Sequence, residues 1–192
     1  MSNDLEPVRL VARRVAAAAP AVAGHRPLAI ALAVAACFAS LPPARAQSTG
    51  AQAIVGSATL TQSGSRLTVT TQNGAGTNHS AINWQSFGVA AGTSTWFAQP
   101  GSTSTSINRV LGPDPSAIFG TLGSNGRLVL VNPAGITVGA GAVVDTAGFT
   151  ASTLRMSDAD ALAGRLVFGG DGMDSAALQI GGRLSREAAT WC

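Results

Sequence analysis

Short stretches of β-forming residues recur roughly every 8–12 residues from Ala53 onward, and this spacing restricts the fold more than any other feature of the sequence. Several stretches alternate apolar with polar residues, as in Leu67-Thr68-Val69-Thr70, and turn pairs such as Asn73-Gly74 and Asn125-Gly126 lie between them. The pattern predicts an all-β domain. The expected strands are Ala58–Leu60, Arg66–Thr71, Ala81–Val89, Thr95–Gln99, Ser106–Val110, Ala117–Leu122, Arg127–Val131, Ile136–Val138, Ala142–Asp145, Phe149–Leu154 and Leu166–Phe168.

One helix is expected over Met156–Arg165, where Ser157 can cap the first turn and Asp158 and Asp160 lie near the helix N-terminus. The strand pattern alone leaves a sandwich, a barrel and a parallel solenoid open. Short strands rich in Val, Ile, Ser and Thr, interrupted by many of the 23 glycines, favour a coil of stacked turns. At roughly 20 residues a turn, residues 47–192 make about seven turns. An immunoglobulin-like sandwich is the alternative.

The first 46 residues have the order of a secretory signal. Residues 1–26 carry the positive charge, Leu28–Leu41 form an uncharged apolar run, and Ala44–Ala46 give a small-residue cleavage site. The run is shorter than the ~20 residues that a membrane-spanning helix needs. The sequence therefore predicts export through the Sec translocon and cleavage after Ala46. The alternative is a lipoprotein box, Val34–Cys37, which would place a lipid on Cys37.

The basic charge of the chain belongs to this signal. All 12 basic residues are Arg, against 9 acids, and five Arg with only two acids precede residue 47. Residues 47–192 therefore carry no net charge and no basic run, which excludes nucleic acid as an expected partner. Their one Cys is Cys192, so no disulfide can form within this part of the chain.

Residue types that support catalysis or metal binding are scarce after residue 47. The one His, His79, has no acid near it in the sequence and is expected in a solvent-exposed loop. Asp114 and Asp145 are the only acids between residues 47 and 157, too few for the carboxylate cluster of a β-helical polysaccharide lyase. Gly169–Asp174 matches one copy of a calcium-binding nonapeptide, but a glycine-rich connection is the favoured interpretation. We expect no enzyme, no cofactor and no metal, with a lyase as the less favoured alternative.

Six short motifs follow one another in a characteristic order and spacing. They are Ala81–Phe87 (AINWQSF), Ser106–Val110 (SINRV), Ser116–Gly120 (SAIFG), Val131–Ile136 (VNPAGI), Gly139–Ala142 (GAGA) and Phe149–Leu154 (FTASTL). In this order they resemble the N-terminal secretion domain, or haemagglutination activity domain, of filamentous haemagglutinin-type exoproteins, the passengers of bacterial two-partner secretion. The resemblance covers residues 49–171.

The resemblance implies a right-handed parallel β-helix, a pectin-lyase-like solenoid, with N-terminal capping strands. The C-terminal residues of this sequence depart from the family pattern, so we expect the β-helix to be incomplete at that end. The resemblance also implies a secreted, non-enzymatic targeting domain of a Gram-negative adhesin with a role in virulence. An outer-membrane barrel transporter with periplasmic binding modules would recognise the domain. Folding of the domain outside the cell would then nucleate the β-helix. A host-cell glycan or receptor is a further expected partner.

The resemblance assigns eight residues to partner recognition or to the fold motif: Asn83, Trp84, Asn108, Arg109, Asn132, Pro133, Gly135 and Ile136. Asn132 and Pro133 are expected to set a tight turn, with an unusual backbone angle at Gly135. Asn108 is expected to satisfy backbone groups inside the stack of turns. Ala134 stands where the family motif frequently has Asn.

The expected organisation is a signal peptide over residues 1–46, a truncated secretion domain over residues 47–182, and an aberrant or disordered tail over residues 183–192. The tail lacks strand alternation and glycine spacing, which indicates a frameshifted or truncated end. The alternative function is a short stand-alone adhesin that binds glycans through aromatic side chains such as Trp84 and Trp96.

Overall fold

The computed structural model describes residues 48–169, 176–185 and 190–191, whose strands form three sheets. The first sheet has the order β1 (Gln52–Val55), β4 (His79–Trp84), β6 (Thr105–Val110), β9 (Arg127–Val131), β12 (Gly148–Ser152), β15 (Thr190–Trp191). The second has the order β2 (Ser57–Ser63), β3 (Arg66–Gln72), β5 (Ser94–Ala98), β8 (Thr121–Ser124), β11 (Val143–Asp145), β14 (Arg183–Ser185). The third consists of β7 (Ser116–Ile118), β10 (Ile136–Val138) and β13 (Leu178–Ile180).

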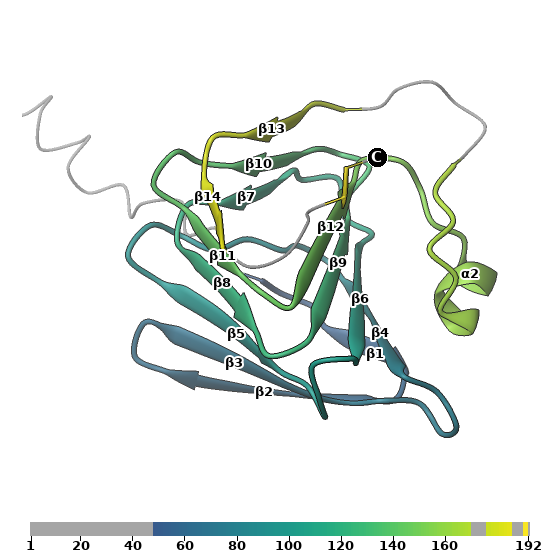
Figure 1. Ribbon diagram of the computed structural model, residues 1–192. Coiled ribbons are helices and arrows are strands. Elements are labelled where there is room, and N and C mark those ends of the chain that lie inside the picture. The colour runs from purple at the N-terminus through teal and green to yellow at the C-terminus, as the bar shows by residue number, and fades with distance from the viewer. Residues whose placement is uncertain (1–47, 170–175, 186–189, 192) are drawn as a thin grey trace, which may run out of the picture. The chain divides into compact units, whose positions relative to one another are not determined.

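From β3 onward, consecutive strands of the chain belong to different sheets, and from β8 onward each pairs in parallel with a strand of the preceding turn (Figure 1). From β6 the chain passes to β7 in the third sheet, to β8 in the second and back to β9 in the first. The neighbouring strands from β3 and β4 onward are parallel and in register. The fold is a parallel β-helix, which selects the solenoid among the architectures that the strand pattern left open.

Two antiparallel strands close the N-terminal end of the coil. β1 pairs antiparallel with β4, and β2 pairs antiparallel with β3 over seven residue pairs. They are the N-terminal capping strands that the family resemblance implies. Within the described residues, no helix is long and apolar enough to cross a membrane.

The inward-facing side chains stack in apolar columns, which together form one continuous core. The largest side chains within it are Trp84 and Phe97, which are 1% and 0% exposed, and Phe87 lies between them. The rings of Trp84 and Phe87 meet edge to face, with their centroids 5.3 Å apart. In the third sheet Ile118 and Val138 stack in register. The core therefore passes through successive turns rather than belonging to any one of them.

The sequence predicts most strands to within a few residues, and Arg127–Val131 and Ile136–Val138 agree at both ends. The predicted strand Ala117–Leu122 is wrong as a single element, because the chain turns a corner at Gly120 between β7 and β8. A Cβ on Gly120 would lie 2.3 Å from the Thr93 carbonyl oxygen, so the corner needs glycine. The predicted strand Leu166–Phe168 is also wrong, since these residues form no regular element.

Two short strands lie within residues 183–192, where an irregular tail was expected. β14 extends the second sheet by pairing in parallel with β11, and β15 extends the first by pairing with β12. Each continues the register of the strand on which it stacks. The predicted signal segment, residues 1–46, lies outside the described residues, as do residues 170–174 of the glycine-rich motif.

After β12 the chain leaves the coil and crosses the outer side of the first sheet as a segment that we call the strap, residues 153–169. The strap contains α2 (Asp158–Ala163), which Figure 1 shows beside β4 and β6. The predicted cap is confirmed, because Ser157 Oγ accepts a hydrogen bond from the Asp160 backbone N–H at 3.1 Å. The helix ends at Gly164, which has a positive φ of 67°.

A substitution at Gly120 tests whether the coil needs glycine at this corner. Gly120→Ala should lower the free energy of unfolding by about 1–3 kcal/mol, because its methyl group would overlap two backbone carbonyl oxygens. Gly141→Ala is the matched control, since a Cβ there would meet nothing within 4 Å. Denaturant titration followed by circular dichroism measures both. Equal midpoints for the two variants would contradict the predicted role of the corner.

The acid dependence of α2 follows from Asp160. The hydrogen bond from Ser157 and the ion pair with Arg165 hold the pKa of the Asp160 carboxyl below its ordinary value of 3.8. Its contribution to stability is therefore complete above the unfolded-state pKa and is lost as the pH falls through the lower folded-state pKa. We expect Asp160→Asn to be less stable than the parent at pH 7 and to converge with it at low pH. A stability difference independent of pH would refute this assignment.

Candidate functional site

Four of the eight residues assigned by the resemblance lie on β4 and β6, which are parallel neighbours. Asn83 pairs in register with Arg109, and Ile82 pairs with Asn108. Since successive residues of a strand point to opposite faces, Trp84 and Asn108 point into the coil, whereas Asn83 and Arg109 point outward. These four residues thus lie in two different environments, two inside the coil and two on its outer face.

Trp84 and Asn108 form a buried hydrogen-bond network that links three turns. Trp84 Nε1 donates to Asn108 Oδ1 at 3.0 Å. Asn108 Nδ2 in turn donates to the Ser106 carbonyl at 3.1 Å and to the Val129 carbonyl at 3.4 Å. Trp84 and Asn108 are 1% and 2% exposed, so neither can touch a partner while the coil is folded. Their contacts make them residues of the fold.

The other four residues form the corner between β9 and β10. Asn132 Nδ2 donates to the Ser116 Oγ at 2.9 Å and to the Asp114 carbonyl at 3.0 Å, which ties this corner to the preceding turn. Asn132 Oδ1 accepts from the Ala134 backbone N–H at 2.9 Å, across Pro133. The turn therefore keeps its side-chain hydrogen bond even with Ala at position 134.

Backbone geometry completes this corner. Gly135 has a φ of 122°, a conformation that residues with a side chain rarely adopt, and its N–H donates to the Asn132 carbonyl. Ile136 follows at once as the first residue of β10 and is fully buried. Asn132, Pro133, Gly135 and Ile136 therefore direct the chain from the first sheet into the third.

The outward-facing side chains of β4, β6 and β9 form a mostly apolar surface under the strap, which we call the ledge. It consists of Ala81, Asn83, Ile107, Arg109, Val129 and Val131. Met156 and Ala161 of the strap pack on its apolar residues, and Phe168 packs at its margin. Sequence reasoning missed this contact, because the helix and the strand Leu166–Phe168 were predicted without a surface for either to pack on.

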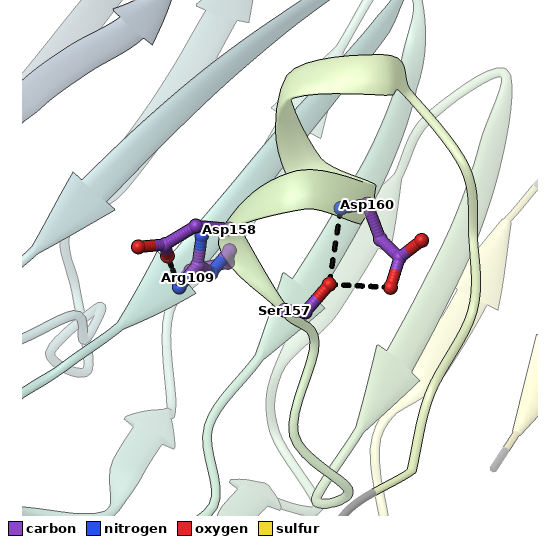
Figure 2. A network of polar contacts seen from close by, with 4 residues as sticks. All are labelled: Arg109, Ser157, Asp158 and Asp160. Carbon is purple, nitrogen blue, oxygen red and sulfur yellow. Dashed lines mark hydrogen bonds and ion pairs between the residues drawn. The ribbon is translucent and has the colours of Figure 1, made fainter.

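Arg109 is the charged centre of the ledge. It is 7% exposed, and its Nη2 forms an ion pair with Asp158 Oδ1 at the start of α2. Figure 2 shows Asp158 pointing toward Arg109, whereas Asp160 turns to Ser157 on the other side of the helix. The Asp158 side chain is 80% exposed, so one partner of this pair is buried and the other is in water.

His79 lies at the rim of the same surface and is buried, which corrects the expectation of a solvent-exposed loop histidine. It begins β4, and its Nε2 donates to the Leu162 carbonyl at 3.2 Å. The ring also packs on Gly164, where a Cβ would approach Nδ1 to 2.6 Å. Leu162 of the strap, 83 residues later in the chain, thus helps to cover this side chain.

The two tryptophans proposed for glycan binding differ in location: one lies inside the coil and the other on its outer face. Trp84 is enclosed by the core, whereas Trp96 of β5 faces outward from the second sheet. Its ring lies over Gly123, whose Cβ would meet Trp96 Cε3 at 2.5 Å, and the Arg66 guanidinium stands 5.6 Å from the ring centroid. Among the described residues, no group of three or more His, Cys, Asp or Glu could hold a metal ion.

Comparison with known proteins agrees with this geometry. The Heme/hemopexin-binding protein of Haemophilus influenzae strain Rd is 34% identical over 104 residues, which are 54% of this chain and 11% of that protein. A second Heme/hemopexin-binding protein of Haemophilus influenzae is 36% identical over 78 residues, 41% of this chain and 8% of that protein. The chain thus spans about a tenth of the length of these relatives.

A solved structure and a family model extend the match over most of the chain. The crystal structure of the HMW1 secretion domain from Haemophilus influenzae superposes with a TM-score of 0.66 at 29% identity. This match covers 76% of the present chain and 39% of that one. The model of the TPS secretion domain matches residues 44–187. Since that is well over half of the sequence, the chain belongs to the TPS secretion domain family, the N-terminal domains of two-partner secretion exoproteins.

Proposed function

We propose that this chain is the targeting and folding-start domain of an adhesin-like exoprotein. The family supplies the coarser part of this function: a TPS secretion domain is a non-enzymatic module that an outer-membrane transporter recognises for export. Adhesion, the nucleation of folding and the contacts with the transporter are the parts that we add. The asymmetry between the two ends of the coil is the observation that supports the nucleation of folding, and the unpaired outer edge of β2 supports the contacts with the transporter.

The asymmetry of the coil supports a role in starting the fold. β1 and β2 pair antiparallel at the N-terminal end and interrupt the parallel stacking there, whereas β13 and β14 at the other end continue the parallel register. On β13 the inward-facing Ile180 is 38% exposed, although Val138 below it is 1% exposed. Apolar side chains at this edge favour the addition of another turn. Growth of the coil is therefore directed toward the C-terminal side.

The outer edge of β2 supports recognition by the periplasmic modules of the transporter. β2 has seven residues without charge or proline, and it pairs with β3 on one side only. Natural edge strands usually carry charged residues or proline, which hinder the addition of another strand. An unprotected edge suits a partner that binds by strand addition. The proposed route begins with Sec export and signal cleavage after Ala46.

Glycan binding is the second candidate function, and Trp96 is the observation that favours it. The ring lies on the outer face of the second sheet, on a floor of small residues that includes Gly123. Arg66 beside the ring and Asp145, in register with Gly123, can bond sugar hydroxyls. A host-cell glycan would then bind to the outside of the coil, away from the strap.

Export of the full chain tests the first function. Expressed together with its transporter, the chain should reach the medium, and without the transporter it should stay in the periplasm. Thr61→Lys places a charge on the edge strand and should reduce the secreted fraction severalfold, because a charged edge resists strand addition. Thr70→Lys is the matched control on the neighbouring strand β3. Secretion that is independent of the transporter, or equal for the two variants, contradicts the proposal.

A glycan array tests the second function. We expect Trp96→Ala to lose any glycan binding of the secreted chain while the amount secreted stays unchanged. Thr68→Ala, on β3 directly beside Trp96, is the control that keeps the ring. Retention of all glycan signals by the Trp96 variant would remove this candidate.

A further inference from the structure

The arginine of the ledge has bonding capacity that the strap does not use. Arg109 is more than nine-tenths buried, and its Nη2 reaches Asp158, but its Nη1 is buried without a hydrogen-bond partner. Asn83 Oδ1, on the neighbouring strand and in register with Arg109, is also buried and unpartnered. A guanidinium can bond a carboxylate through both terminal nitrogens, and a buried donor left without a partner is costly. The strap therefore satisfies the ledge only in part.

The strap buries little apolar surface on the ledge, although its Leu162 carbonyl also bonds His79 at the rim. Two of its side chains, Met156 and Ala161, are buried against the ledge, and Asp158 is mostly in water. Its outer side exposes Leu162 and Val167, which are 53% and 54% exposed. A segment with so little buried apolar surface can open locally while the stacked turns stay folded. Opening would expose the ledge as a unit.

Because the strap follows the ledge in the chain, the ledge can form before the strap covers it. The strands that form it, β4, β6 and β9, all precede the strap in the chain. Until the strap arrives, Ile107, Val129 and Val131 are bare around one cation. The complementary surface is an apolar segment that carries a carboxylate, and a carboxylate that bonds both terminal nitrogens of Arg109 fits better than Asp158 does.

We propose that the ledge is the docking surface for an acidic, apolar segment of the outer-membrane transporter, and that closure of the strap displaces this segment when the domain is released. This inference rests on the proposed function and adds to it a surface and a release step. Asp158 takes the place of the carboxylate of the transporter in the closed state. The apparent affinity for the transporter is then proportional to the fraction of molecules with the strap open, so closure of the strap lowers it.

Binding of the full chain to the purified full-length transporter tests this proposal. Arg109→Gln should weaken binding by about tenfold or more, because the carboxylate of the transporter loses its buried partner. Arg127→Gln is the matched control, since Arg127 is an exposed arginine of β9 in the same sheet. Arg109→Lys keeps the charge but lacks the fork, so it should also weaken binding. If Arg109→Gln does not fold, Arg109→Lys is the variant that tests the proposal.

Asp158→Asn should have the opposite effect. Loss of the ion pair favours the open strap, so the affinity for the transporter should rise about threefold. Trypsin measures the opening, because cleavage after Arg155 or Arg165 of the strap requires the surrounding chain to unfold locally. Cleavage there should speed up severalfold without a change in the unfolding midpoint of the coil. Asp145→Asn, on the second sheet, is the control for charge.

The possible results separate the two levels of the argument. If the wild-type chain binds the transporter and the Arg109 variants bind as Arg127→Gln does, the ledge is not the docking surface. If Asp158→Asn opens the strap but binds no more tightly than the wild type, the strap does not compete with the transporter. A wild-type chain that does not bind at all overturns the proposed function itself, and with it the role of the ledge.

Discussion

Most strands of this coil have only three to seven residues, so no turn can bury its own inward face. Burial depends on the register that each strand shares with the turns on either side. In the third sheet Ile118, Val138 and Ile180 stand in one column. The first two are 0% and 1% exposed, whereas Ile180 at the sheet edge is 38% exposed. The same side-chain position is thus core or surface according to whether a neighbouring turn is present.

Polar side chains inside the coil keep the turns in this register. Asn108 bonds a backbone carbonyl of the next turn, and Asn132 bonds one of the preceding turn. Gln99 does the same at another corner, where its Nε2 donates to the Arg127 carbonyl at 2.8 Å. A carbonyl left unpaired in the interior would be costly, so each amide favours one alignment of neighbouring turns. Most motif residues of the family are therefore explained by the fold, and Asn83 and Arg109 are the two that face outward.

The strands and the helix cap that depend on neighbouring residues could be predicted from the sequence. The features that depend on contacts between distant residues could not. The apolar run of Arg127–Val131 and the Ser157 cap are properties of adjacent residues, and the strand and the cap predicted from them are both confirmed. The break at Gly120 depends on the carbonyls of Ala90 and Thr93, a full turn earlier. His79 is buried only because Leu162 and Gly164 come to cover it. No spacing in the sequence reports contacts over such separations.

The strap and the coil depend on one another in a fixed order. Arg109 and Asp158 are 49 residues apart, and the side chains that cover Arg109 come from a segment made after β12. Met156 and Ala161 pack against residues of β4, β6 and β9 together, so they find their surface only when these three turns are already stacked. Closure of the strap is thus a consequence of correct stacking and in turn clamps the stacked turns across their outer face. For a domain that a transporter recognises, the completed outer surface is therefore present only when the first turns are in register.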